Sequence, residues 1–158
     1  MKTRLYVLLF VLLTQVTLPA ITGFAADVFS GTWTVNVAKS TFSPGPPLKG
    51  QTVQFLPVGD DMRVIIDSTG ADGKAVHSEW FGKFDGKDYA MKGDPNIDTR
   101  SFKKIDDYTL EIIAKKGSQV ITTTRTVYNK DGKTRVSTQT GINAQGQKVS
   151  NTIFSEKQ

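Results

Sequence analysis

The sequence predicts an all-β protein: an antiparallel meander of about ten short strands, closed or strongly curved into a barrel. Segments rich in β-formers recur along the chain, separated by turn signals at intervals of about 8–12 residues. Three turns share the sequence Asp-Gly-Lys, at residues 72–74, 85–87 and 131–133. Asp-Gly is typical of tight hairpins, because glycine readily adopts the positive φ that they require. A barrel would remove the exposed edges of an open sheet, and a two-sheet sandwich is the alternative.

Residues 1–26 have the layout of a secretory signal peptide. Lys2 and Arg4 precede an uninterrupted apolar run, and small residues suited to cleavage follow at Ala25 and Ala26. The apolar run is too short to span a bilayer as a helix, so we expect no stable membrane insertion. The sequence therefore predicts an exported protein, periplasmic or extracellular, whose mature part, residues 27–158, forms a single domain.

The composition excludes several classes of function. The chain contains no cysteine, which rules out a disulfide scaffold, thiol catalysis and a thiolate metal site. Its formal net charge falls from +5 to +3 without Lys2 and Arg4, because all fifteen acidic residues follow the leader. An excess this small does not indicate nucleic-acid binding, and we expect no nucleic-acid partner.

Ten segments have the alternation or the β-rich composition of strands. They are residues 29–37, 52–55, 62–68, 75–84, 89–92, 99–105, 108–114, 119–128, 134–142 and 148–155. In the first, Trp33, Val35 and Val37 share one face. The prolines at 44–47 then break the periodicity, so this region allows a single helical turn at residues 38–41 but no long helix.

The expected strand at residues 75–84 lies between two of the Asp-Gly-Lys turns. Trp80 and Phe84 occupy one face of it, and His77 and Glu79 occupy the other. His77, the only histidine, could form an acid–base pair with Glu79, but we expect this pair to face solvent because it is opposite the aromatic face. No Ser-His-Asp or Cys-His arrangement can be built around it. The sequence therefore predicts a protein that is not an enzyme.

Residues 119–128 have mixed polarity on both faces. One face holds Val120, Thr122, Thr124, Thr126 and Tyr128, and the other holds Ile121, Thr123, Arg125 and Val127. A polar-lined cavity would explain this pattern, with Arg100 or Arg125 meeting the carboxylate of a ligand. The alternative is that threonine simply favours strands and that the arginine points into water.

Residues 94–98, Asp-Pro-Asn-Ile-Asp, begin like a calcium-binding loop. The pattern then fails, because Thr99 stands where the sharp-turn glycine belongs and Ile105 where the bidentate glutamate belongs. Asp-Pro-Asn is common in ordinary turns, so the sequence predicts a turn here. We expect neither a metal nor a cofactor.

Gly31-Thr32-Trp33 is similar to the Gly-x-Trp signature of lipocalins and the wider calycin group. The run at residues 31–42, with the proline-rich stretch and Asp-Gly-Lys turns that follow, resembles a group of uncharacterised exported lipocalin-like proteins of bacteria. The resemblance implies a barrel that holds a small hydrophobic molecule, with Trp33 plugging its closed end. It also implies a late arginine stacked on this tryptophan, and because the last expected strand has none, only Arg125 or Arg135 could substitute.

These observations predict an exported, non-catalytic binding protein for a small hydrophobic or amphipathic ligand. The candidate ligand-binding residues are Trp33, Phe55, Trp80, Tyr89, Tyr108, Arg100 and Arg125. The alternative is an extracytoplasmic protein-interaction module whose core is solid, which predicts no cavity and an exposed apolar patch. The interior of the barrel discriminates between the two.

Overall fold

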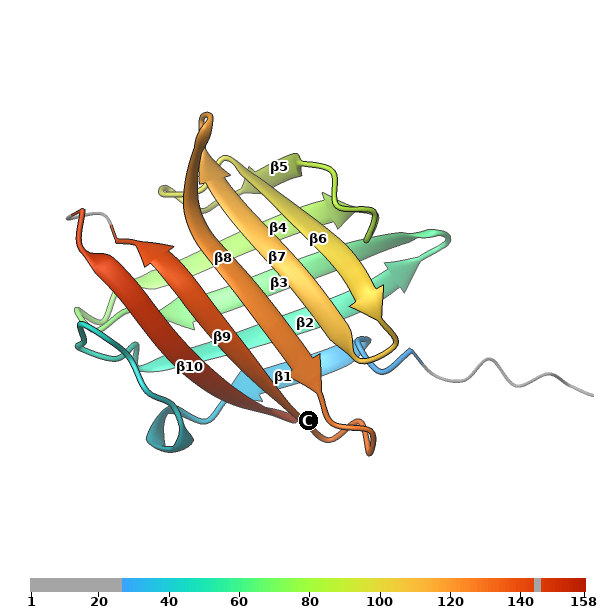
Figure 1. Ribbon diagram of the computed structural model, residues 1–158, viewed down its shortest axis with the longest axis horizontal. Helices are drawn as coiled ribbons and strands as arrows, with labels where there is room; N and C mark the ends of the chain where they lie inside the picture. The colour runs from blue at the N-terminus through green and yellow to red at the C-terminus, as the bar shows by residue number, and fades with distance from the viewer. Residues whose placement is uncertain (1–26, 144–145) are drawn as a thin grey trace, which may run out of the picture.

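The computed structural model describes residues 27–143 and 146–158, and within them ten antiparallel strands form a closed barrel (Figure 1). The predicted fold class is confirmed, and the sandwich alternative was wrong. The expected signal peptide lies outside the described residues. The strands are β1 (Gly31–Val35), β2 (Gly50–Val58), β3 (Asp61–Thr69), β4 (Ala75–Gly82), β5 (Tyr89–Lys92), β6 (Thr99–Asp106), β7 (Thr109–Lys116), β8 (Gln119–Tyr128), β9 (Thr134–Ile142) and β10 (Lys148–Lys157).

Each strand pairs with its neighbours in the sequence, and β1 completes the barrel by pairing with β10. In that closing pair, Trp33 stands opposite Lys157 and Val35 opposite Ser155. Figure 1 shows β6–β10 crossing in front of β1–β5. In the described part of the chain, closure leaves no strand at a sheet edge.

The three Asp-Gly-Lys turns share a glycine with positive φ and one local hydrogen bond. Their glycines, Gly73, Gly86 and Gly132, have φ values of 84°, 80° and 67°. In each turn, the lysine amide donates to the side chain of the aspartate two residues earlier, at 3.0, 3.0 and 2.9 Å. This arrangement follows from the sequence, because aspartate accepts such local bonds and glycine takes positive φ without strain.

The apolar strand faces meet in an aromatic core at the centre of the barrel. Trp33, Trp80 and Phe102 are all at most 1% exposed. Phe84, expected within a strand, instead follows β4, and its ring stacks on that of Phe102 with 5.5 Å between centroids. The strand ends at Gly82, where the Tyr89 ring is so close that an added Cβ would meet it at 2.5 Å.

The proline-rich segment between β1 and β2 contains one short 3-10 helix, η1 (Val37–Lys39), near the expected helical turn. Asn36 caps it by accepting a hydrogen bond from the amide of Lys39 at 3.1 Å. Thr41 then pairs with Thr152 of β10 through two backbone hydrogen bonds, of 2.8 and 2.9 Å. A search of the described residues finds no helix with the length and hydrophobicity needed to cross a membrane.

Candidate functional site

A cavity of about 110 Å³ lies inside the barrel. Its apolar lining comes from six side chains: Val53, Phe55, Ile66, Phe102, Ile112 and Ile153. Its hydroxyl lining comes from Thr122, Thr124, Thr126, Ser137 and Ser155, all on β8–β10. Two arginines, Arg100 and Arg135, and two glutamines, Gln51 and Gln139, complete it. The cavity therefore has an apolar wall, a hydroxyl wall and two cationic groups.

The volume limits what the cavity can hold. At about 110 Å³, the cavity is large enough for several water molecules. Sites for drug-sized ligands span about 300–1,000 Å³. A small ligand therefore fits inside, whereas a long acyl chain does not.

The hydroxyl wall follows from the pairing of β8 with β9. The register places Thr126 opposite Ser137 and Thr124 opposite Gln139, with all four side chains facing inward. Thr126 Oγ1 and Ser137 Oγ are 2.8 Å apart and share a hydrogen bond. Gln139 Nε2 donates to Thr124 Oγ1 at 3.4 Å, and Asn151 Nδ2 donates to Gln139 Oε1 at 2.9 Å. Part of the wall is thus satisfied by its own side chains.

Other cavity-lining groups have no such partners. The side chains of Gln51, Thr122 and Ser155 form no hydrogen bond with any described residue, although Ser155 is only 1% exposed. Gln51 and Thr122 are half-buried, so their polar groups are not removed from water, and none of the three side chains has a fully buried polar atom without a partner. These three side chains can therefore bond to a molecule in the cavity.

Arg100 is the most unusual residue of the cavity. Its Nε atom is buried without a hydrogen-bond partner, and its side chain forms no ion pair or hydrogen bond within the described residues. Burial lowers the pKa of Arg100, and the charge of Asp94 opposes this shift. The backbone is fixed, because Trp80 Nε1 donates to the Arg100 carbonyl oxygen at 2.7 Å. A half-buried guanidinium whose Nε is buried, and which has no bonded carboxylate, is well suited to receive an anion.

Arg135 is also buried, at 7% exposed, but aromatic rings surround it. Its guanidinium carbon lies 4.9 Å from the ring centroid of Trp33 and 5.4 Å from that of Phe55. Its Nη1 donates to Tyr128 Oη at 2.8 Å, while its Nε has no partner. Burial raises the pKa of Tyr128, and the positive charge of Arg135 acts against this. The sequence left open whether Arg125 or Arg135 stacks on Trp33. The residue that does so is Arg135.

The two arginines approach the cavity from opposite ends of the barrel. Arg100 of β6 stands opposite Ala114 of β7, and Ala114 stands opposite Thr122 of β8. Thr122 in turn stands opposite Gly141 of β9. Arg135 lies six residues before Gly141, about 20 Å along the strand. Arg135 is therefore a closing element beside Trp33, and Arg100 is the cation available at the other end.

The candidate ligand-binding residues divide between the inside and the outside of the barrel. Phe55 and Arg100 line the cavity. Trp33 and Trp80 are buried in the aromatic core and do not line it. Tyr89 is half-buried, and its ring packs edge-on against that of Trp80 with 5.6 Å between centroids.

The remaining two candidates, Tyr108 and Arg125, are exposed. Tyr108 is 37% exposed and borders a groove on the outside of the barrel. Arg125 lies between Thr124 and Thr126, both of which face inward, so its own side chain faces outward. The prediction of a polar-lined cavity thus holds for Arg100, whereas Arg125 lies outside that cavity.

Sequence reasoning overlooked Gln51, Ser137, Gln139 and Ser155, and it considered Arg135 only as a partner for Trp33. One signal could have placed Arg135 inside. The hairpin around the third Asp-Gly-Lys turn pairs Tyr128 with Arg135, and directly paired residues face the same side of a sheet. The short polar residues carried no comparable signal.

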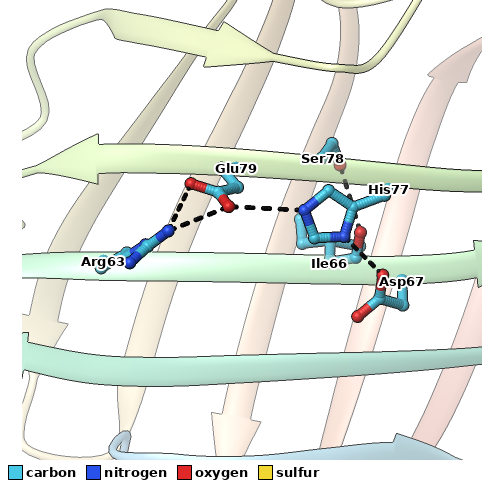
Figure 2. A network of polar contacts seen from close by, with 6 residues as sticks. All are labelled: Arg63, Ile66, Asp67, His77, Ser78 and Glu79. Carbon is cyan, nitrogen blue, oxygen red and sulfur yellow. Dashed lines mark hydrogen bonds and ion pairs between the residues drawn. The ribbon is translucent and has the colours of Figure 1, made fainter.

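His77 belongs to a polar network on the outer surface, as the sequence predicts (Figure 2). Its Nδ1 lies 2.7 Å from Asp67 Oδ1, and its Nε2 lies 3.4 Å from Glu79 Oε1. Arg63 Nη2 donates to both oxygens of Glu79, at 2.9 and 2.8 Å. The network joins the exposed faces of β3 and β4, away from the cavity.

This network has a defined pH dependence. Hydrogen bonds to Asp67 and then to Glu79 raise the pKa of His77. Arg63, followed by His77, lowers the pKa of Glu79. A raised histidine pKa means that the contribution of His77 to stability is fully present below its unfolded-state pKa and is lost as pH rises through its folded-state pKa.

The turn expected at residues 94–98 is confirmed. The amide of Asn96 donates to Asp94 Oδ1 at 2.9 Å, and Asp98 forms an ion pair with Lys116 at 2.7 Å. Across the described residues, no three His, Asp or Glu side chains are grouped so that they could hold a metal ion.

Comparison of the chain with models of known protein families gives no match, and comparison with curated proteins gives none. The resemblance to lipocalin-like proteins therefore stays a prediction. What the protein does must be argued from the barrel and its cavity.

Proposed function

We propose that this protein is an exported, non-catalytic binding protein for a small amphipathic molecule, held in the barrel cavity by an anionic group that contacts Arg100. The observation that carries the proposal is the guanidinium of Arg100, which lines the cavity with its Nε buried and unpartnered. A ligand carboxylate would supply the charge and the hydrogen-bond acceptors that Arg100 lacks within the described chain.

The two walls of the cavity support an amphipathic ligand over a purely hydrophobic one. Phe55, Phe102 and Ile112 offer apolar surface to the carbon skeleton. The threonines of β8 offer hydroxyl groups, which a hydrocarbon would leave without partners. The volume of about 110 Å³ favours a short molecule over a fatty acid with a long chain.

The alternative function, a protein-interaction module, has one observation in its favour. Val127, Val136 and Phe154 are directly paired across β8, β9 and β10 on the outer face of the barrel. Val127 is 48% exposed and Val136 is 39% exposed. The same alternative requires a solid interior, however, and the cavity argues against that. Ligand binding is therefore the better supported function.

The proposal is tested by titrating the purified protein with short carboxylates, acetate to hexanoate, and with the matching neutral amides. Binding is followed by calorimetry and by tryptophan fluorescence, to which Trp80, hydrogen-bonded to the backbone of Arg100, contributes together with Trp33. We expect carboxylates to bind and amides to bind at least tenfold more weakly, because only the carboxylate pairs with the guanidinium.

Two matched variants locate the site. Arg100→Met should abolish carboxylate binding, because it keeps an unbranched side chain but removes the charge. Arg125→Met removes an exposed arginine on the outer face and should leave binding unchanged. The proposal is refuted if no carboxylate binds, if amides bind equally well, or if the two variants weaken binding to the same extent.

A further inference from the structure

We propose that the guanidinium of Arg135 holds a small monovalent inorganic anion, such as chloride, beside Trp33 inside the barrel. This anion site is separate from the carboxylate site proposed at Arg100, because the two arginines approach the cavity from opposite ends. It is independent of the proposed function, so either site can be disproved without the other.

One edge of the Arg135 guanidinium has no partner in the described chain. Aromatic rings surround the group, with its carbon 4.9 Å from the ring centroid of Trp33, 5.4 Å from that of Phe55 and 5.5 Å from that of Tyr128. Nη1 is occupied by its hydrogen bond to Tyr128 Oη. Nε is buried without a partner, and Nη2 forms no hydrogen bond with a described residue. Nε and Nη2 lie on the same edge, and two such donors side by side are the fork with which arginine binds anions.

Within the described chain, no carboxylate pairs with the positive charges at this end of the barrel. Arg135 is only 7% exposed, and Lys157 adds a second cation, with its Nζ 5.4 Å from the ring centroid of Trp33. Burial and then the charge of Asp27 raise the pKa of Tyr128, but Asp27 forms no ion pair with either cation. Buried charges are normally paired, because the desolvation of an unpaired charge is costly. An anion at the free edge of Arg135 would supply the missing negative charge.

The hydroxyl pair of Thr126 and Ser137 offers such an anion one further donor. The register places Tyr128 opposite Arg135 and Thr126 opposite Ser137, so the pair is the next one along the same inward face. The two oxygens share one hydrogen bond, and each hydroxyl group carries one proton. The shared bond uses only one of these protons, whichever side chain donates. The other proton has no acceptor among the described residues and can be donated to an anion.

The close packing around Arg135 favours an inorganic ion over an organic acid. Trp33, Phe55 and Thr126 are all at most 1% exposed. The cavity, about 110 Å³, exceeds the roughly 30 Å³ that one water molecule occupies in the liquid, so an ion not much larger than water fits. An organic acid would also have to place its carbon skeleton among the aromatic rings. The chemical class that this end accepts is therefore a halide or an ion of similar size.

The test compares the melting temperature of the mature protein in sodium chloride and in sodium gluconate, whose anion is too large for the cavity, at equal ionic strength. We expect chloride to raise the melting temperature saturably, by roughly 3–6 °C when it exceeds its dissociation constant about tenfold. Arg135→Met removes the guanidinium and should abolish this shift. Arg100→Met removes the other arginine of the cavity, and Arg125→Met removes an exposed arginine. Both of these variants should retain the shift.

Bromide gives a second readout that needs no variant, so the test still decides if Arg135→Met fails to fold. In crystals of the wild-type protein grown with bromide in place of chloride, anomalous scattering should locate an ion within hydrogen-bond distance of Arg135 Nε or Nη2. Bromide found only at exposed lysines would be an adventitious ion only, and would count against the site.

The anion site is refuted if chloride and gluconate give the same melting temperature, or if no bromide lies at Arg135. The aromatic rings and Tyr128 would then be the only partners of the guanidinium, and the proposed function would stand. The site is also refuted if the chloride shift survives in Arg135→Met or is lost in Arg100→Met or Arg125→Met, because the anion would then bind elsewhere. A chloride shift that depends on Arg135, in a protein that binds no carboxylate, would remove the proposed function and leave this site in place.

Discussion

Replacing Arg100 with methionine should make the ligand-free protein more stable. In the wild-type protein the guanidinium is held in the cavity without an ion pair or a hydrogen bond from the described residues. Methionine fills similar space with an unbranched apolar chain and needs no partner. The hydrogen bond from Trp80 survives, because it is made to the backbone carbonyl of residue 100.

The expected gain is about 1–2 kcal/mol. An unsatisfied buried polar group costs about 1–3 kcal/mol, and more when it is charged. Replacing buried charges by apolar residues often stabilises a protein by about 1–4 kcal/mol. The lower part of these ranges applies here, because Arg100 is not completely enclosed and the charge of Asp94 compensates for part of the cost.

Urea denaturation at neutral pH, followed by tryptophan fluorescence, measures this gain. With an m-value of about 2 kcal/mol per molar urea, the midpoint for Arg100→Met should rise by roughly 0.5–1 M at unchanged m. Arg125→Met, at an exposed position, should stay within about 0.5 kcal/mol of wild type. A loss of more than about 1 kcal/mol in Arg100→Met, with Arg125→Met neutral, would show that Arg100 has partners within the protein.

Three further predictions concern the scaffold. Trp33→Ala should lower the free energy of unfolding by about 3–5 kcal/mol, because Trp33 is fully buried against Arg135; a loss below about 1 kcal/mol in urea titrations would contradict this packing. The ring of His77, followed by NMR, should titrate above its unfolded-state pKa. The stability advantage of wild type over His77→Gln should disappear as pH rises through the higher, folded-state pKa. A titration at or below the unfolded-state pKa would contradict the network. Gly141→Ala should be strongly destabilising, because the added Cβ would meet the Ile121 carbonyl oxygen at 2.0 Å. Gly50→Ala is the control and should be tolerated, because there is open space around its Cβ. Equal thermal stability of the two variants would show that the strands do not pack this closely.

Local sequence patterns were sufficient to predict the hairpins and most of the strands, whereas closure of the barrel depends on the pairing of β1 with β10, which are far apart in the sequence. The Asp-Gly-Lys turns fix where hairpins form, and alternation in β3 and β4 fixes which residues face inward. Val64 and Trp80 are buried as alternation predicts, and His77 is exposed. These features depend on residues close together in the sequence, so they can be read without knowledge of the rest of the fold.

The cavity was only partly predictable, for a physical reason. In β8 both faces contain threonine and valine, so alternation does not reveal which of Arg125 and Thr124 points inward. That choice is made by the neighbouring strands, through the pairing of Thr124 with Gln139 and of Tyr128 with Arg135. Cavity volume likewise depends on how side chains from many strands fill the interior.

The most direct test of the central claim is the NMR signal of the Arg100 Nε–H group during titration with a short carboxylate. The signal is assigned by its absence from Arg100→Met, and the Nε–H signal of Arg125 is the internal control. Binding at the unpartnered guanidinium predicts a saturable shift of the Arg100 signal, while that of Arg125 stays in place. If the Arg100 signal does not move, or if both signals move together without saturating, the cavity is not the anion site.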